Sequence, residues 1–588
     1  MTCKVLAMVL AALLAAGCTA SQTNSAAPTK ALPHVHASLA AHSAVFETRV
    51  EKVTDGVYVA IGYALANSIM LEGDDGVVIV DVTESAETAR VVLAAFREIT
   101  DKPIKALIYT HNHADHVFGG GGFFPDGVPA DFPVYAHDST NYYINRFANI
   151  IRPAIATRSA RMFGTELPAG DEGVVNAGIG PYLAQGGHSG GTIALLRPNK
   201  TFSDSLSLDV AGLRIELIHA PGETNDQLFV WLPDKGVLLP GDNIYKAFPN
   251  LYTIRGTLYR DVLQWAYSID KMRALKPEFL VPSHTIPVSG KQEVAGLLRD
   301  YRDAIQYVHD QTIRGINQGL SPDELVRRVQ LPPHLKSHPW LQEHYGRVSW
   351  SVRNIFNGYL GWFGGDATQL TPLAPAERSA ALVETMGGFD QVVLLIEKAI
   401  AERRYQWAAE LASEALGLKD SKHVRALKAD AFRALAYASE NPNDRHFYLT
   451  QAGELVGEIR VAQPELKSDS LAFAKSLPIG EVLASLPVNL NAEKSLDRDT
   501  RVLFEFSDTG ERYGVHVRKG VAELLRGEAL NSWESSDIQV KTTTGTLVEV
   551  LMQARGVPGA LASGDIKLGG GVWDVPAFAS FLLLFKQD

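Results

Sequence analysis

Three histidines and one aspartate fall within the short segment Thr110-His111-Asn112-His113-Ala114-Asp115-His116. The apolar run Ile104–Tyr109 that precedes them is typical of a buried strand. In an extended turn His111 and His113 point to the same side, whereas Asp115 and His116 come from the following turn. This arrangement suits two metal ions a few ångströms apart, one for each pair. A cluster of surface histidines is the alternative interpretation, and this spacing at a strand end argues against it.

Short apolar runs separated by turns dominate residues 45–290, whereas Ala86–Ile99 has helical spacing. The runs predict strands at Val57–Ala60, Gly76–Asp81, Leu213–Ile218, Leu228–Leu232 and Val237–Leu239. Strands that alternate with occasional helices indicate a layered α/β fold. Long amphipathic helices such as Lys291–Gly315 and Gln391–Leu416 follow, and strands return after residue 483. Three folded domains result, which agrees with 588 residues at roughly 100–200 per domain.

Both cysteines, Cys3 and Cys18, lie at the N-terminal end of the chain. The remaining residues therefore offer no thiolate ligand, disulfide or cysteine nucleophile, and the chemistry must use oxygen and nitrogen. The 55 basic and 66 acidic side chains give a net charge of −11. Because such a charge gives no bulk attraction to a phosphate backbone, we expect no nucleic-acid partner.

The segment Met1–Cys18 predicts a signal peptide. Lys4 precedes the apolar run Val5–Ala16, which is shorter than the roughly 20 residues that span a bilayer. Residues 14–18, Leu-Ala-Ala-Gly-Cys, resemble the lipobox of bacterial lipoproteins, which implies acylation of Cys18. An ordinary cleaved signal with an incidental cysteine is the alternative. We expect an exported, periplasmic protein that is anchored to a membrane through lipid on Cys18.

The residue after that cysteine, Thr19, is not acidic, which favours the outer over the inner membrane of a Gram-negative host. Residues 19–45 are rich in Ser, Ala, Thr, Pro and His and are expected to form a flexible linker. We interpret His34, His36 and His42 as linker residues and not as metal ligands.

The cluster at 111–116 is the signature His-x-His-x-Asp-His, and in this the chain resembles the metallo-β-lactamase superfamily. The resemblance implies an α/β fold, an αββα sandwich with its site at one edge and further ligands downstream. Three later segments resemble the family's ligand motifs and point to Glu223, Asp242 and His284. Glu223 stands where most members have a histidine, and His219 nearby is interpreted as structural.

The resemblance implies how these residues divide between two ions. His111, His113 and Glu223 are assigned to one ion, and Asp115, His116 and His284 to the other. Asp242 and a water bridge the pair. Because the ligands are imidazoles and carboxylates, two Zn²⁺ per chain are the most economical choice.

Glu223 and the segment Asn250–Gly256 narrow the resemblance to the bacterial alkylsulfatases, which hydrolyse dodecyl sulfate and similar surfactants. Gly358–Phe363, Tyr405–Leu411 and Tyr448–Thr450 also resemble that family. The resemblance implies three domains. They are a catalytic domain over 46–378, an all-α dimerisation domain over 379–480, which implies a homodimer, and an α+β sterol-carrier-like domain with an apolar tunnel over 483–588.

The sequence departs from the alkylsulfatase pattern at two places. The family usually has a glutamate at the bridging position, where this chain has Asp242. After the last ligand the family continues with His and Trp, where this chain has Thr285 and Ile286. A role that this histidine has in the family therefore cannot be assigned to Thr285. Both changes affect what can be expected of the substrate preference.

The expected reaction is hydrolysis of a linear alkyl sulfate to alcohol and sulfate by a metal-bridged hydroxide. Asp115 and Arg255 are the expected catalytic residues, and the Arg255 guanidinium matches a tetrahedral oxyanion. Asn250, Tyr252, Arg255 and Arg260 are expected to bind the substrate, an anionic amphiphile. The alternatives are a hydrolase of lactones, carboxylic esters or phosphodiesters, and a non-catalytic surface lipid-binding protein. The sequence does not identify the general acid.

Overall fold

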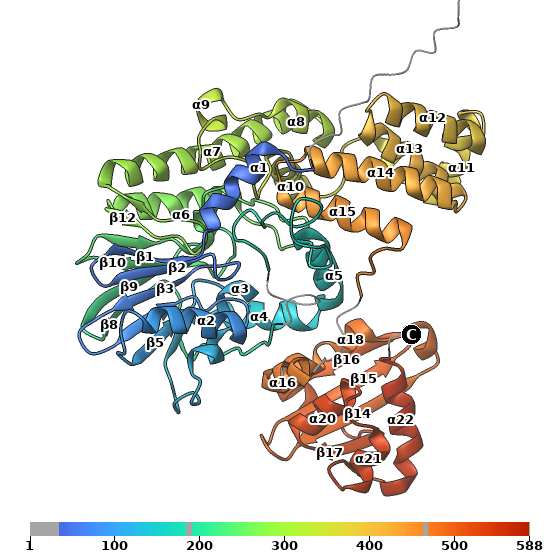
Figure 1. The fold of residues 1–588 in the computed structure, drawn as a ribbon. Coiled ribbons are helices and arrows are strands. Elements are labelled where there is room, and N and C mark those ends of the chain that lie inside the picture. The colour runs from blue at the N-terminus through green and yellow to red at the C-terminus, as the bar shows by residue number, and fades with distance from the viewer. Residues whose placement is uncertain (1–33, 184–190, 463–467, 587–588) are drawn as a thin grey trace, which may run out of the picture.

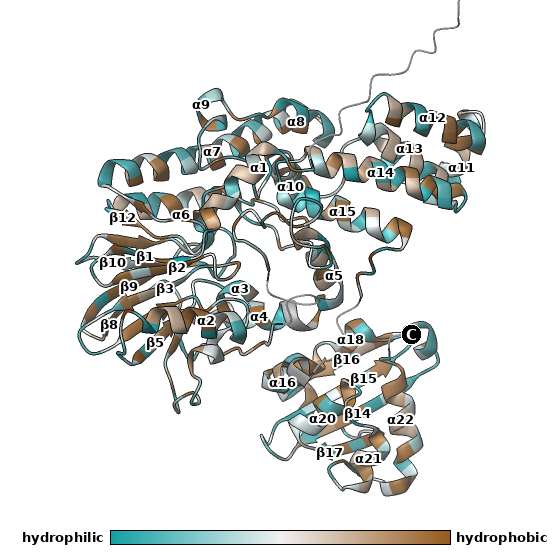
Figure 2. Cartoon of the chain, in the orientation of Figure 1, coloured by the Kyte–Doolittle hydropathy of each residue, from teal (hydrophilic) through white to brown (hydrophobic). Residues whose placement is uncertain are grey.

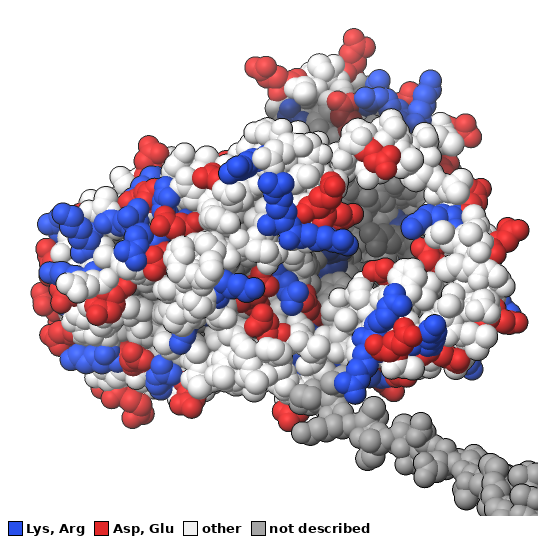
Figure 3. Space-filling model, turned by 90° about the horizontal axis from the view of Figure 1, so that it is seen from above, with Lys and Arg blue, Asp and Glu red and all other residues white. Residues whose placement is uncertain are grey.

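The computed structural model describes residues 34–183, 191–462 and 468–586. Three parts follow one another along the chain: an α/β body, a group of helices and a small C-terminal α+β part (Figure 1). The expected signal segment and Cys18 lie outside the described residues. Acidic and basic side chains are interspersed over the face of the molecule shown in Figure 3.

The first sheet of the α/β body has seven strands in sequence order. They are β1 (Arg49–Thr54), β2 (Val57–Ile61), β3 (Ser68–Glu72), β4 (Val77–Val80), β5 (Ile104–Ile108), β6 (Val134–His137) and β7 (Lys200–Phe202). The pairs from β1 to β4 are antiparallel, and those from β4 to β7 are parallel. Helix α2 (Ala86–Arg97) joins β4 to β5, and the Ser85 side chain caps it by accepting from the Thr88 amide.

The second sheet has six strands, and strands that follow one another in the sequence are neighbours in the sheet. They are β8 (Ser205–Val210), β9 (Leu213–His219), β10 (Leu228–Leu232), β11 (Val237–Leu239), β12 (Phe279–Leu280) and β13 (Val288–Ser289). Strand β10 is buried along its whole length, which explains its unbroken apolar sequence. Edge strand β8 alternates between exposed and half-buried residues, as its sequence Ser-Leu-Ser-Leu-Asp-Val requires.

The two sheets face each other across one apolar core, which includes Val59 of β2 and Leu217 of β9. Helices α6 (Val262–Ala274) and α7 (Lys291–Asn317) bury an apolar stripe on the outer side of the second sheet. Helix α2 covers the outer side of the first sheet. Figure 2 shows apolar residues concentrated on these strands. The αββα sandwich expected from the resemblance is confirmed.

Residues 37–46 differ from the flexible linker that we expected to extend to residue 45. They form α1 (Ala37–His42) and the short helix η1 (Ser43–Phe46). Leu39 and His42 are buried, and the His42 ring lies 2.8 Å from the Gly178 carbonyl oxygen. The sequence prediction was wrong here because contacts with distant residues, not local composition, order this segment.

The middle part is helical, as expected, but the range Gln391–Leu416 that was expected as one helix contains two, Phe389–Ala401 and Tyr405–Leu418. Helices α8 (Pro322–Arg328), α9 (Pro333–Lys336) and α10 (Val348–Leu360) adjoin the sandwich, and α11 (Pro375–Thr385), α12 (Phe389–Ala401), α13 (Tyr405–Leu418), α14 (Lys422–Ala438) and α15 (Pro442–Val456) follow. Helix α15 returns to the α/β body, where Glu454 pairs with Arg161 at 2.7 Å. Among the described residues no single helix is long and apolar enough to cross a membrane, although α11 and α12 pass that test as a pair bent by 82°.

The C-terminal part contains a five-stranded sheet. Its strands are β14 (Asp499–Phe506), β15 (Arg512–Arg518), β16 (Val521–Leu525), β17 (Ile538–Thr542) and β18 (Lys567–Leu568). Helices α16 (Ser468–Ser476), α17 (Ile479–Leu483), α18 (Leu486–Asn489), α19 (Gly527–Asn531), α20 (Thr544–Leu551), α21 (Val557–Ala562) and α22 (Val575–Leu583) complete this part. Phe473 and Leu477 lie in one apolar cluster with residues of these strands, so the segment before residue 483 packs with this part.

A cavity of about 500 Å³ lies in the C-terminal part, between α16–α18, α20 and α22. Leu551 and Met552 line it, together with Leu582 and Phe585. Leu547 and Val548, in contrast, are fully buried in the core of the same part. The apolar segments Leu547–Met552 and Val575–Phe585 therefore contribute both to the core and to the cavity wall.

Candidate metal centre

The histidine-rich segment lies where β5 ends at the edge of the first sheet. His111 follows the strand, His113 is the extended residue that precedes helix α3 (Ala114–Val117), and Asp115 and His116 belong to that helix. The change from extended chain to helix sends the side chains in two directions. Two compact groups of potential ligands result, His111–His113–Asp242 and Asp115–His116–His284.

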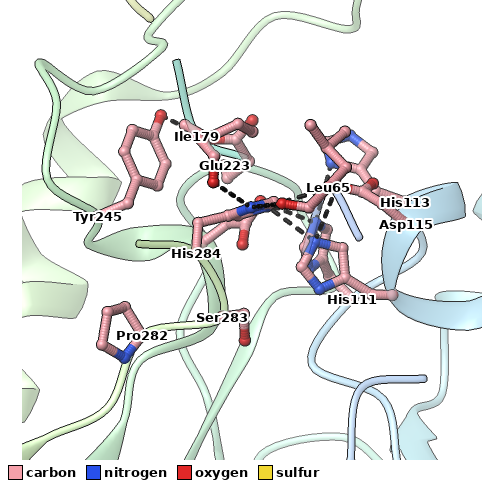
Figure 4. Close-up of polar contacts among 12 residues, drawn as sticks. Leu65, His111, His113, Asp115, Ile179, Glu223, Tyr245, Pro282, Ser283 and His284 are labelled. Atoms are coloured by element: carbon pink, nitrogen blue, oxygen red, sulfur yellow. Dashed lines mark hydrogen bonds and ion pairs between the residues drawn. The ribbon is translucent and has the colours of Figure 1, made fainter. Parts of the chain in front are cut away.

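Asp242 lies between the two groups. Its Oδ2 atom is 3.7 Å from His111 Nε2, 3.4 Å from His116 Nε2 and 3.2 Å from His284 Nε2. Asp115 Oδ2 is 3.5 Å from His116 Nε2 and 3.4 Å from His284 Nε2. The side chains converge on one point from both sheets (Figure 4). Asp242 therefore has the position that a bridging carboxylate requires.

Glu223, expected as the third ligand of the first ion, lies outside both compact groups. Its Oε1 atom is 2.8 Å from Arg260 Nη1, and Tyr245 Oη donates to its Oε2 at 3.2 Å. Burial raises the pKa of Glu223 to about 6, although Arg260 opposes the shift. The structure thus brings together six of the seven expected ligands and places the seventh in an ion pair beside them.

Asp81 is a residue of the site that sequence reasoning missed. It accepts hydrogen bonds from the Thr110 amide at 2.8 Å, the Thr110 hydroxyl at 2.9 Å, His116 Nδ1 at 2.8 Å and the Ser283 hydroxyl at 2.7 Å. The hydrogen bond to Nδ1 leaves the lone pair of His116 on Nε2, which faces the site. The sequence could have indicated Asp81, because it directly follows β4, the strand beside the one that leads to His111.

Backbone and hydroxyl groups orient two other rings. The Thr110 hydroxyl gives its proton to Asp81, so it accepts one from His111 Nδ1, 3.0 Å away. His284 Nδ1 lies 2.9 Å from the Leu65 carbonyl oxygen and 3.2 Å from that of Ile179. Because carbonyls only accept, Nδ1 carries the proton and Nε2 presents its lone pair. All three rings thus offer Nε2 to the centre.

The two groups differ in their electrostatics. Burial lowers the pKa of His111 to about 4, with a further decrease from His116, and it lowers the pKa of His113 as well. Burial alone would lower the pKa of His116 and His284, but Asp242 and Asp115 raise both, that of His284 to about 10. The second group thus sits in a strongly negative field that favours a cation.

The donor set fits a pair of divalent ions. Within the described part of the chain, His116 Nε2, His284 Nε2 and Asp242 Oδ1 are buried and make no hydrogen bond. Unpaired buried atoms of this kind are costly unless a ligand satisfies them. Imidazole and carboxylate ligands without sulfur suit zinc and other borderline or hard divalent ions.

The four residues expected to bind the substrate lie on one loop beside the ligands. Arg255 is half-buried, and its Nη2 lies 3.2 Å from His113 Nε2. Asn250 is fully buried, and within the described chain its side-chain amide makes no hydrogen bond. Arg260 is held by Glu223 and by the Asn250 carbonyl, and Tyr252 is half-buried.

The remaining histidines of the sequence analysis lie elsewhere. His219 stacks on His137 with ring centroids 3.9 Å apart and bonds to the Asn225 carbonyl at 2.8 Å, in agreement with a structural role. His36 caps α1 by accepting from the Ser38 amide. Thr285, at the position of the family's extra histidine, adopts φ of 70° and accepts from the Lys246 amide at 3.0 Å. Its hydroxyl is therefore occupied by backbone contacts.

Family models match three consecutive stretches of the chain. They are described as metallo-beta-lactamase superfamily for residues 62–284, alkyl sulfatase dimerisation for 321–458 and alkyl sulfatase C-terminal for 467–588. A linear primary-alkylsulfatase of Pseudomonas sp. (strain ATCC 19151) is 39% identical over 526 residues, covering 87% of this chain and 97% of the relative. The chain belongs to the alkylsulfatase family of the metallo-β-lactamase superfamily.

Two further relatives of this alkylsulfatase-family chain come from Pseudomonas sp. An (R)-specific secondary-alkylsulfatase is 30% identical over 533 residues, covering 88% of this chain and 78% of the relative. The solved structure of the stereoselective inverting sec-alkylsulfatase Pisa1 aligns with a TM-score of 0.87 at 28% identity, covering 94% of this chain and 87% of that one. The similarity thus extends over all three parts, and a metal-dependent hydrolase is what the family implies.

Asp81→Asn tests the role of the missed carboxylate. The amide keeps the shape but removes the charge that fixes the His116 proton on Nδ1, so we expect metal affinity to fall about 10–100-fold. Competition with a chromophoric chelator measures this. Asp138→Asn, which changes an exposed carboxylate bonded to Ser203, is the control. Equal affinity in Asp81→Asn and the parent protein would contradict the assignment.

Proposed function

We propose that the protein hydrolyses linear alkyl sulfate esters to the alcohol and sulfate, with two Zn²⁺ ions per chain. The observation that carries the proposal is the pair of ligand groups joined by Asp242, with Arg255 directly beside His113. The 39% identity with a linear primary-alkylsulfatase over nearly its whole length supports the choice of a primary alkyl sulfate.

Two zinc ions fit the imidazole and carboxylate donors of both groups. His111, His113 and Asp242 would hold one ion, and Asp115, His116, His284 and Asp242 the other. Glu223 reaches the first ion only if its carboxylate turns away from Arg260. When bound, such ions supply Lewis-acid stabilisation and acidify water to a pKa near 7.

The side chains around the ligands suit a sulfate group. Arg255 and Arg260 add two permanent positive charges. Glu223 partly neutralises Arg260, whereas Arg255 makes no ion pair among the described contacts and lies beside His113. Its planar fork can donate two parallel hydrogen bonds to sulfate oxygens. The side-chain amide of Asn250, buried without a partner in the described chain, can donate a further hydrogen bond to the sulfate. These donors bind and orient the anion without needing a proton from it.

The loop that carries the donors is itself fixed. Tyr245 Oη accepts from the main-chain N–H of Asn250 at 2.7 Å and donates to Glu223 at 3.2 Å. Arg158 donates to the carbonyl oxygens of Ile254 and Arg255. The positions of Asn250 and Arg255 are therefore set before a substrate arrives, which lowers the cost of binding it.

Sulfate release from dodecyl sulfate by the metal-loaded protein tests the proposal. We expect turnover with primary alkyl sulfates of roughly 6 to 14 carbons. Arg255→Lys keeps the charge but loses the fork, so kcat/KM should fall about 10²-fold or more. The control is Arg425→Lys, because Arg425 lies on the far helix α14 and pairs with Asp420.

Three results would contradict it. No sulfate release, together with turnover of lactones, carboxylic esters or phosphodiesters, would identify a different hydrolase on this scaffold. Lipid binding without zinc and without any turnover would identify a surface lipid-binding protein. Full activity in Arg255→Lys would remove Arg255 from the sulfate site.

We also propose a homodimer. The match to an alkyl sulfatase dimerisation model over residues 321–458 supports it, and so do apolar side chains exposed on the helices of this region, Leu394, Trp407 and Leu418. Light scattering should give twice the mass of one chain. A single-chain mass at micromolar concentration would contradict the proposal.

Export and a lipid anchor on Cys18 complete the proposal, with the periplasmic face of the outer membrane as the location. The lipobox-like residues 14–18 support it. Expressed from the full-length gene in a Gram-negative host, the parent protein should sediment with membranes and Cys18→Ser should not. Cys3→Ser is the control, and equal distribution of all three proteins would contradict the anchor.

A further inference from the structure

The N-terminal helices α1 and η1 contact a loop that reaches the metal centre. This loop, residues 176–180, lies between α5 (Arg152–Phe163) and β7 in the sequence, and Gly180 lies beside Leu65. Its residue Ile179 provides one of the two carbonyl oxygens next to His284 Nδ1. The loop and the N-terminal helices are far apart in the sequence but in direct contact in the structure.

Several hydrogen bonds join the N-terminal helices to the loop. Asn176 Nδ2 donates to the Leu39 carbonyl oxygen at 3.1 Å and to the Ser43 hydroxyl at 2.9 Å. His42 Nε2 donates to the Gly178 carbonyl oxygen at 2.8 Å. Asn176, His42 and Leu39 are all buried. Because these bonds lie away from water, each one restrains the loop strongly.

The loop has little freedom of its own. Gly178 adopts φ of +82°, and a Cβ atom there would lie 2.0 Å from the His344 carbonyl oxygen. Asn176 Oδ1 accepts from the Gly178 amide at 2.9 Å, and the Ala177 amide donates to Gly180 at 2.8 Å. The carbonyl groups of Gly178 and Ile179 are therefore fixed relative to each other. A displacement of Gly178 also moves the oxygen next to His284.

A second contact holds the His42 ring in place. The ring stacks on His344 with centroids 4.0 Å apart, and His344 Nε2 lies 2.8 Å from the Ser38 hydroxyl. Burial lowers the pKa of His42 to about 4, so the ring is neutral at ordinary pH. Neutral imidazole has a single N–H, which is committed to Gly178.

We propose that α1 and η1 form an N-terminal clamp, residues 36–46, in which His42 acts with Asn176 to position the metal ligand His284. Both act through the Gly178–Ile179 backbone, which together with the nearer Leu65 carbonyl keeps the proton on His284 Nδ1 and aims Nε2 at Asp115 and Asp242. The proposal rests on the proposed function, because it assigns His284 to a metal. Groups that hold a ligand ring in this way commonly change metal affinity about 10–100-fold when removed.

Metal affinity tests the proposal without relying on activity. In His42→Ala and in Asn176→Ala we expect the ion of the Asp115–His116–His284 group to bind about 10–100-fold more weakly, with the ion at His111 and His113 less affected. Zinc competition against a chromophoric chelator gives both affinities. The visible spectrum of the Co²⁺-loaded protein reports the geometry at His284.

Two more variants separate positioning from general loss of stability. His42→Gln retains an N–H donor and should restore most of the affinity lost in His42→Ala. His516→Ala removes an equally enclosed ring from the C-terminal part, where it bonds to Asp499 at 2.7 Å, and should leave both affinities unchanged. Thermal unfolding shows whether each variant is folded. If His42→Ala does not fold, the same metal-affinity measurement is made with Asn176→Ser.

Parent-like affinities and Co²⁺ spectra in the folded His42 and Asn176 variants would overturn the clamp while leaving the proposed function intact. Equal losses in His516→Ala would also overturn it, since the effect would then be general. A parent protein that binds no divalent ion would overturn both proposals, so the two failures are distinguishable.

Discussion

The buried carboxylate of Asp81 connects two of the segments that carry ligands, residues 110–116 and residues 283–284. It follows β4 and accepts from the amide and hydroxyl of Thr110 after β5, from His116 in α3 and from Ser283, the neighbour of His284. These segments come from both sheets, so one side chain fixes the edge of the sandwich at which the site lies. Asp81 also adds to the negative field that raises the pKa of His116.

Local sequence specified the parts of the fold that depend on local physics. The unbroken apolar residues 228–232 predicted a buried strand, and the spacing of 111–116 predicted two groups of side chains at a strand end. The N-terminal helices could not be predicted in this way, because this Ser- and Ala-rich segment becomes ordered through distant residues such as Asn176, Gly178 and His344. The ion pair of Glu223 with Arg260 was equally hidden, since no pattern reveals which of two nearby partners a buried carboxylate will choose.

The two departures from the family pattern have different structural consequences. Asp242 is one methylene shorter than glutamate, yet its Oδ2 still lies within 3.7 Å of His111, His116 and His284. The backbone of the short helix η3 (Gly241–Asn243), where Gly241 adopts φ of 59°, brings the carboxylate close enough. At Thr285 the chain adopts a left-handed conformation that β-branched residues rarely take. Where the family pattern has a histidine, this chain has a hydroxyl that bonds to the backbone.

The N-terminal clamp is held by contacts of long sequence separation. One of its hydrogen bonds, from Asn176 to Leu39, spans 137 positions of the sequence, and another, between Ser38 and His344, spans 306. Arg445 donates to the His34 carbonyl oxygen across 411 positions. The N-terminal helices can therefore make these contacts only after His344 and Arg445 have been synthesised. Contacts of such long sequence separation form late, because closing the chain between them costs entropy before it gains stability. A chain that is truncated or misfolded downstream would then leave His284 poorly held, so a complete fold is coupled to a competent site.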